Sequence, residues 1–104
     1  MENKDKNKDE ILQILKRHKE EFYKKYGVEE IGLFGSVARG EEAAKSDIDI
    51  LVEYRENIKR TLFDEAGLII ELQNILKKEN VDLAVKKNLN KYYKDGILKE
   101  VIYA

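Results

Sequence analysis

Two aspartates that alternate along one apolar segment, shortly after a Gly-Ser pair, restrict the fold of this chain more than any other feature. The pair is Gly35-Ser36, and ten residues separate it from Asp47, with Asp49 two residues further on. The apolar residues around the aspartates predict a β-strand, in which residues two apart point to the same face, about 6–7 Å apart along the chain. Both carboxylates therefore share one side of the strand, and the intervening apolar side chains enter a core on the other.

Two carboxylates this close together repel each other, and a positive charge nearby would reduce the repulsion. At about 6 Å and an effective dielectric constant of about 20, two anions repel each other by about 3 kcal/mol. A hard divalent cation with oxygen ligands would relieve that repulsion. The Gly-Ser turn ahead of the aspartates offers free backbone N–H groups at the start of a helix, which suits a phosphate. The spacing therefore indicates a site for a metal–nucleotide complex.

Length and composition exclude several other kinds of site. The 104 residues suit one compact domain over 1–104, with residues 1–6 frayed. A formal charge of −1 gives no reason to expect direct nucleic-acid binding, and the absence of cysteine excludes disulfides and thiolate chemistry. No apolar run approaches the roughly 18–20 residues of a membrane span, and no signal-peptide segment begins the chain. We therefore expect a cytoplasmic protein without a membrane partner.

Hydrophobic periodicity predicts helices that alternate with strands. The first long helix has capping residues at Asn7 and Glu10 and a stop at Gly27, and the second begins with the pair Thr61 and Asp64. The predicted elements are a helix over 9–26, a strand over 28–34, a short helix over 36–43, a strand over 47–54, a helix from 61 to about 80, a strand over 81–85 and a last helix that includes 92–102. This order predicts an α/β (α+β) fold, with a small mixed sheet of about three to four strands flanked by helices.

A third aspartate extends the candidate site. Asp82 lies in the strand predicted over 81–85, with apolar neighbours that face the other way. If this strand lies beside the one that carries Asp47 and Asp49, the three carboxylates converge on one face of the sheet. Two-metal nucleotidyl transfer requires such a cluster. Asp47 and Asp49 would hold Mg²⁺ ions that bridge the nucleotide phosphates, and Asp82 would help hold the second ion and activate the attacking hydroxyl.

The turn would supply the phosphate contacts. Gly35 permits close backbone approach, the Ser36 hydroxyl and amide would hold the β- and γ-phosphates, and Arg39 would add charge near the leaving group. Each residue also has a simpler interpretation, since Asp-x-Asp is common on exposed strands, a glycine suits any turn, and Arg39 would form a surface ion pair with Glu41 or Glu42. The joint order of strand, turn, short helix and two acidic strands favours the site. It is not a P-loop, because no G-x-x-x-x-G-K-S/T sequence is present.

Two segments resemble the signature of minimal nucleotidyltransferases in the DNA polymerase-β superfamily. They are GSVARG at 35–40 and SDIDILV at 46–52. VDLAV at 81–85 resembles that family's third-acid strand, and ILKEVIY at 97–103 is similar to its C-terminal helix. The resemblance covers about residues 28–103.

This resemblance implies a polymerase-β palm-like nucleotidyltransferase fold, with Mg²⁺ (two ions) as cofactor and ATP as co-substrate. It assigns Gly35 and Ser36 to nucleotide binding, Asp47 and Asp49 to metal binding, and Asp82 to metal binding or general base. It also implies a partner, because such proteins are commonly antitoxins to a HEPN-domain ribonuclease toxin. Members of the family inactivate that toxin by transferring AMP to its tyrosine hydroxyl, so we expect a protein adenylyltransferase.

Two alternatives remain open. The chain would be a binding-only antitoxin if it masked the toxin without catalysis, and it would be a small-molecule (antibiotic) nucleotidyltransferase if a drug were its acceptor. About 100 residues leave no room for a substrate domain, so we expect a partner protein to hold or supply the acceptor. The apolar last helix and Tyr92, Tyr93 and Tyr103 are candidates for docking; alternatively, the apolar side chains of that helix simply cover the sheet.

Overall fold

The computed structural model describes residues 7–41 and 47–104. The expectations of a frayed segment at 1–6 and of a loop up to Ser46 therefore fall, wholly or mostly, outside the described residues. The bounds of the elements are α1 Lys8–Tyr26, β1 Val28–Phe34, α2 Gly35–Ala38, β2 Ile48–Tyr54, α3 Leu62–Leu76, β3 Val81–Val85, the 3-10 turn η1 Lys86–Asn88, α4 Lys91–Glu100 and β4 Ile102–Tyr103.

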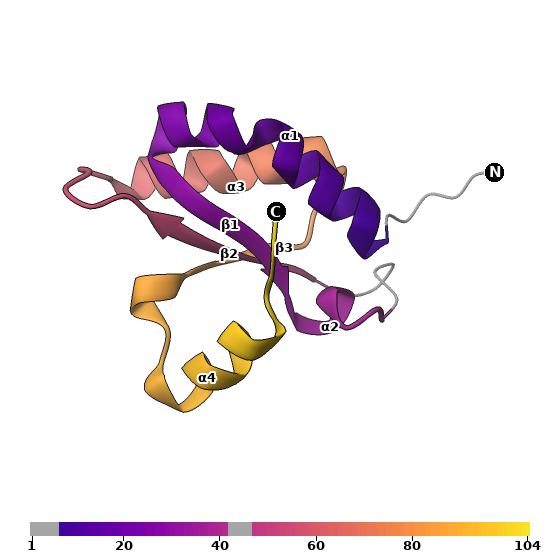
Figure 1. Ribbon diagram of the computed structural model, residues 1–104. Coiled ribbons are helices and arrows are strands. Elements are labelled where there is room, and N and C mark those ends of the chain that lie inside the picture. The colour runs from indigo at the N-terminus through magenta and orange to yellow at the C-terminus, as the bar shows by residue number, and fades with distance from the viewer. Residues whose placement is uncertain (1–6, 42–46) are drawn as a thin grey trace.

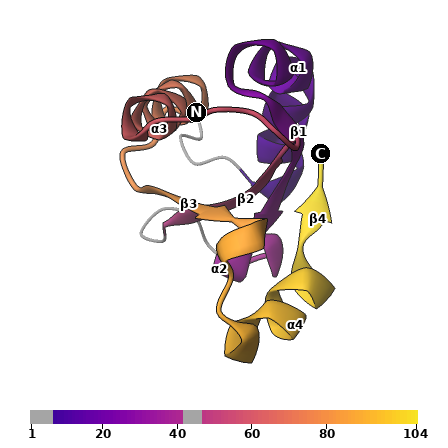
Figure 2. The same ribbon diagram turned by 90° about the vertical axis from the view of Figure 1, so that its left-hand side faces the viewer.

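The four strands form one mixed sheet, in the order β3-β2-β1-β4. β1 runs antiparallel to both β2 and β4, whereas β2 and β3 are parallel. Helices α1 and α3 lie together on one side of the sheet, and α2 and α4 lie on the other side (Figures 1 and 2). The predicted fold class, a small mixed sheet flanked by helices, is confirmed. Across the described ranges, no helix has the length and apolar character needed to cross a membrane.

The two long helices begin where their sequences predict. At the start of α1, the Glu10 N–H donates to Asn7 Oδ1 over 2.9 Å, and the Asn7 N–H donates to Glu10 Oε1 over 3.1 Å. Thr61 and Asp64 form the same reciprocal pair at the start of α3. Such caps satisfy N–H groups that lack partners in the first helical turn. Gly27 ends α1 in the left-handed conformation, with φ 75°.

The hydrophobic core lies between the sheet and the α1–α3 pair. Its central members are the buried side chains Ile11, Leu15, Phe22, Leu33, Ile48, Ile50, Val52, Leu68, Leu72 and Leu76. Each such side chain stabilises the fold by about 1.5–3 kcal/mol when it is buried. Because side chains alternate along β2, burial of Ile48 and Ile50 on this side directs Asp49 to the opposite side, toward α2 and α4. A one-residue slip in register would bury the carboxylate, so the core fixes where the acid lies.

Two helix boundaries differ from the prediction. The short helix does not extend over 36–43: α2 ends at Ala38, and Gly40 has a φ of 85° that favours leaving the helix; residues 42–43 lie outside the described chain. Asn80 does not stop α3, which ends at Leu76, because Lys77 adopts the left-handed conformation that usually falls to glycine.

The end of the chain also differs from the prediction. The last helix stops at Glu100, and Ile102–Tyr103 form β4, which pairs with Gly32 and Leu33 of β1. This segment is β-branched and aromatic, and β1 would otherwise present an unpaired edge, so both features favour a strand. The apolar residues Ile97, Leu98, Val101 and Ile102 are half-buried rather than fully covered.

Candidate active site

Asp49 and Asp82 are direct neighbours across the parallel pair of strands β2 and β3. Adjacent strands lie about 4.8 Å apart, and paired residues point to the same face. The residues that flank them along each strand, Ile48, Ile50 and Val81, are buried in the core. Both carboxylates therefore lie side by side on the face away from that core. A site that uses both acids needs this arrangement.

Asp47 completes the group from just outside the strand. β2 begins at Ile48, one residue later than predicted, so Asp47 is an exposed residue at its entrance. Burial, a hydrogen bond with the Asp47 side chain and the negative charge of Asp47 all raise the pKa of Asp82. The hydrogen bond of this pair shows that the side chains of Asp47 and Asp82 lie within reach of each other.

The electrostatic cost of the cluster falls mainly on Asp49. Burial and then the negative charges of Asp82, Asp47 and Glu100 raise the pKa of Asp49 to about 6, against a smaller opposing effect of Arg39. A half-buried carboxylate in such a field favours a proton or a cation as its partner.

Gly35 is placed against Asp49 by the end of β1. Phe34, the last residue of β1, pairs with Asp49, and the chain then turns at Gly35 with φ 80°. A Cβ at this position would lie 2.1 Å from Asp49 Oδ2. Only glycine meets both demands, the left-handed backbone and the missing side chain. Ser36 follows directly after this glycine in the first turn of α2 and is half-buried.

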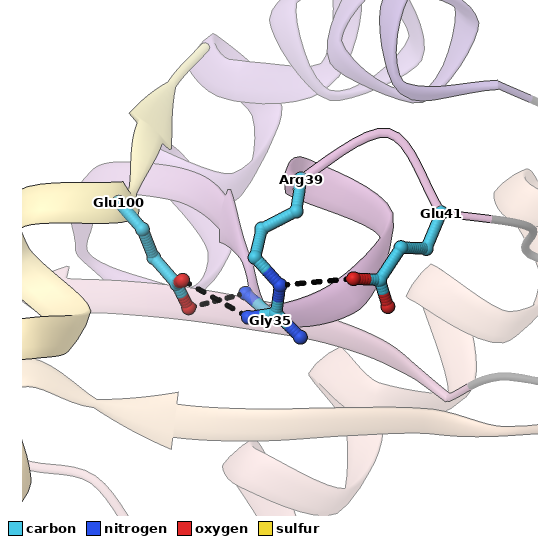
Figure 3. A network of polar contacts seen from close by, with 4 residues as sticks. All are labelled: Gly35, Arg39, Glu41 and Glu100. Atoms are coloured by element: carbon cyan, nitrogen blue, oxygen red, sulfur yellow. Dashed lines mark hydrogen bonds and ion pairs between the residues drawn. The ribbon is translucent and has the colours of Figure 1, made fainter.

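Arg39 is engaged in ion pairs rather than free. Its Nη1 donates to Glu100 Oε1 over 3.0 Å, and its Nε donates to Glu41 Oε2 over 3.2 Å (Figure 3). The pair with Glu41 is the surface ion pair that the sequence left open as the simpler interpretation. The other Glu100 oxygen, Oε2, accepts from the Gly35 N–H over 2.8 Å. Sequence reasoning missed Glu100, because nothing in the spacing of α4 marks it as a neighbour of the Gly-Ser turn.

The donor set suits Mg²⁺ as one part of its coordination shell. Asp47, Asp49 and Asp82 offer only oxygen atoms, which is what this ion prefers. Within 7–41 and 47–104, however, no three His, Cys, Asp or Glu side chains are gathered so that they would hold a metal ion by themselves. Mg²⁺ is commonly bound through one or two carboxylates together with substrate phosphates and water. The arrangement therefore fits an ion that arrives with a nucleotide.

Comparison with known proteins gives the same chemistry. Residues 15–104 match the family described as nucleotidyltransferase domain. A candidate protein adenylyltransferase of Methanocaldococcus jannaschii is 44% identical over 99 residues, which cover 94% of this chain and 98% of the relative. Protein adenylyltransferase MntA of Thermococcus cleftensis is 40% identical over 95 residues, which cover 91% of this chain and 93% of the relative.

Solved structures share the fold. A candidate minimal nucleotidyltransferase that is 34% identical superimposes with a TM-score of 0.64, over 91% of this chain and 86% of that one. A toxin–antitoxin structure with AMP-PNP shares 21% identity at a TM-score of 0.64, over 94% and 72% of the two chains. An MNT antitoxin in complex with a tri-AMPylated Shewanella oneidensis HEPN toxin shares 20% identity at a TM-score of 0.56, over 93% and 67%. The match over most of its length shows that this chain is an enzyme of the nucleotidyltransferase domain family.

Proposed function

We propose that this protein is a Mg²⁺-dependent antitoxin that transfers AMP from ATP to a tyrosine hydroxyl of a partner HEPN toxin and so neutralises it. The observation that carries the proposal is the position of Asp49 beside Asp82, with Asp47 at the entrance of the same strand and the Gly-Ser turn against Asp49. The names of the relatives support AMP transfer to a protein. The MNT–HEPN complex with its AMPylated toxin supports the choice of partner.

The reaction assigns a task to each side chain. The attacking hydroxyl oxygen forms a bond to the α-phosphorus of ATP, the bond from that phosphorus to the bridging oxygen breaks, and pyrophosphate leaves. Bound Mg²⁺ would neutralise the phosphates and polarise the α-phosphate. Asp47 and Asp49 would hold the ions, two if the mechanism follows the two-metal scheme. Asp82 would contribute to the second ion and accept the proton of the hydroxyl, a task that its raised pKa favours.

The phosphate chain would lie along the start of α2. Ser36 would donate from its hydroxyl and amide to the β- and γ-phosphates, and Gly35 keeps the space beside Asp49 free of a side chain. Arg39 lies one turn further on, and its positive charge would partly neutralise the negative charge of the departing pyrophosphate. The Arg39 ion pairs with Glu41 and Glu100 mean that this charge is already partly neutralised.

The direct test is AMP transfer to the partner. Purified protein, the HEPN partner, ATP and Mg²⁺ are incubated together, and the mass of the partner is measured. Wild-type protein should add AMP to a tyrosine, and the double variant Asp47→Asn/Asp49→Asn should add none. A matched control is Glu20→Gln/Glu21→Gln, which removes the same charge from exposed positions of α1. If wild type and the aspartate variant leave the partner equally unmodified, the proposal is wrong.

Masking without catalysis is the second candidate, and the exposed aromatics of α4 favour it. Tyr92 and Tyr93 are 82% and 65% exposed. A masking antitoxin should protect cells equally well when it carries Asp47→Asn/Asp49→Asn. Loss of protection by this variant, with the complex still intact, would show that binding alone does not neutralise the toxin.

A further inference from the structure

Glu100 contacts two groups of the site, the Gly35 N–H and the Arg39 guanidinium, through a single carboxylate. Oε2 accepts the backbone N–H of Gly35 over 2.8 Å, and Oε1 accepts Nη1 of Arg39 over 3.0 Å (Figure 3). The acceptor lies at the end of α4, and the two donors lie at the start and the end of α2. Both oxygens are thus used, and the carboxylate holds the short helix at its two ends.

The place of Glu100 is fixed by the strand that follows it. Directly after α4, Tyr103 pairs with Gly32 of β1, three residues before Gly35. The two segments approach so closely that a Cβ on Gly32 would lie 2.9 Å from both the Ile102 carbonyl oxygen and Val101 Cγ2. The β4 pairing therefore sets the backbone of Glu100, the last residue of α4, close to the turn.

We propose that Glu100 is a positioning residue for nucleotide binding: it holds the Gly35–Ser36 turn and orients Arg39 so that both face the phosphates. The inference rests on the proposed function. In this proposal, the two residues of the turn have different roles. The Gly35 N–H donates to Glu100, and Ser36 makes the contacts with the phosphates. A helix of only four residues has little stability of its own, so contacts with the rest of the protein must hold it. Val37 and Ala38 are buried in the core, and Glu100 adds contacts at the two ends of the helix.

The opposite role is that of a competitor. In that role, the Glu100 carboxylate would occupy the Gly35 N–H and the Arg39 guanidinium in place of a phosphate. It would then have to leave before ATP binds. The two roles predict opposite signs: removing a brace weakens nucleotide binding, whereas removing a competitor strengthens it. The geometry favours the brace, because Arg39 keeps a second acidic partner in Glu41 and because the β4 pairing holds Glu100 in place.

The test uses Glu41→Ala as a matched control for Glu100→Ala. Both variants remove one carboxylate partner of Arg39 and the same charge, but only Glu100 contacts Gly35. Dissociation constants are measured for Mg²⁺–AMP-PNP, and KM for ATP and kcat are measured with the HEPN partner. Loss of charge-assisted hydrogen bonds should raise the dissociation constant and KM about tenfold in Glu100→Ala and less than twofold in Glu41→Ala.

A conservative variant separates positioning from a general loss of structure. Glu100→Gln keeps an oxygen acceptor for the Gly35 N–H but presents an amide N–H group to Arg39, so it should recover part of the affinity. In the ¹H–¹⁵N spectrum, the Gly35 amide should shift in Glu100→Ala and keep its position in Glu41→Ala, whatever the activity. Equal effects of the two alanine variants, an unmoved Gly35 signal or tighter nucleotide binding in Glu100→Ala would overturn the inference. Absence of AMP transfer by the wild type would instead contradict the proposed function.

Discussion

The two sides of the sheet differ in what their residues contribute. The side that faces α1 and α3 buries only apolar residues; in the described part of the chain no polar or charged side chain is fully buried. The side that faces α2 and α4 gathers three aspartates, a glutamate and a glycine with positive φ, and α4 itself has no buried residue. The first side supplies stability, and the second gives up stability to hold like charges close together. A site that holds like charges together lowers stability, so it needs a separate apolar core that offsets this loss.

The largest expected effect is on the apolar side. Leu72 of α3 is fully buried in the core, so Leu72→Ala should lower the free energy of unfolding by about 3 kcal/mol. Nucleotide affinity of the molecules that remain folded should stay close to that of the wild type, since the side chain lies on the far side of the sheet. Denaturant unfolding and AMP-PNP titration measure the two quantities. A large loss of affinity with unchanged stability would contradict the division of the two sides.

On the acidic side, the sign of the stability effect should reverse. Burial, followed by the neighbouring negative charges, raises the pKa of Asp49 to about 6, so ionised Asp49 destabilises the metal-free fold at neutral pH. Asp49→Asn should therefore stabilise the metal-free protein at pH 7 by about 1 kcal/mol, less than the full shift implies because the side chain is only half-buried. The same change should abolish AMP transfer. Thermal unfolding with and without Mg²⁺ is the measurement, and Mg²⁺ should stabilise the wild type more than the variant.

The pH dependence of the stability difference between the wild type and Asp49→Asn tests whether the raised pKa of Asp49 is its cause. Below about pH 4, Asp49 is protonated in both the folded and the unfolded state and contributes no penalty. As the pH rises toward about 6, the folded state retains the proton longer than the unfolded chain does, so the wild type loses stability relative to Asp49→Asn. Above about pH 6 the difference should level off. A gap that narrowed as the pH rose from 4 to 6 would contradict the assigned cause.

The sequence predicted most of the apolar side and the acidic strands, because both depend on local patterns. The caps at Asn7 and Thr61 and the alternation around Asp49 are each readable within a few residues. The sequence pattern did not predict that β2 and β3 are parallel neighbours. That pairing was assumed, because the three aspartates can form one site only if these strands lie side by side. It depends on contacts between segments far apart in the chain, which no local pattern encodes.

The parts that escaped prediction depend on those distant contacts. The pattern around Ile102 was compatible with a continued helix, and the unpaired edge of β1 made it a strand. Glu100, two residues before that strand, lies beside Gly35, which is 65 residues away in the sequence. Lys77 ends α3 in a conformation that its side chain does not favour, so the helix stops before the Asn80 that the sequence suggested.

The smallest expected effect on stability concerns the exposed aromatics on the two sides. Tyr92 on α4 is 82% exposed and Phe63 on α3 is 87% exposed, so alanine at either position should change the free energy of unfolding by less than about 0.5 kcal/mol. If the proposed partner docks over the acidic side, where the proposed acceptor tyrosine would have to reach the α-phosphate, Tyr92→Ala should weaken the complex about tenfold and Phe63→Ala should leave it unchanged. Calorimetric titration with the HEPN partner compares the two. A loss confined to Phe63→Ala would place the partner over the α1–α3 helices, too far from Asp49 for direct transfer, and the two sides of the sheet would then not divide stability from function.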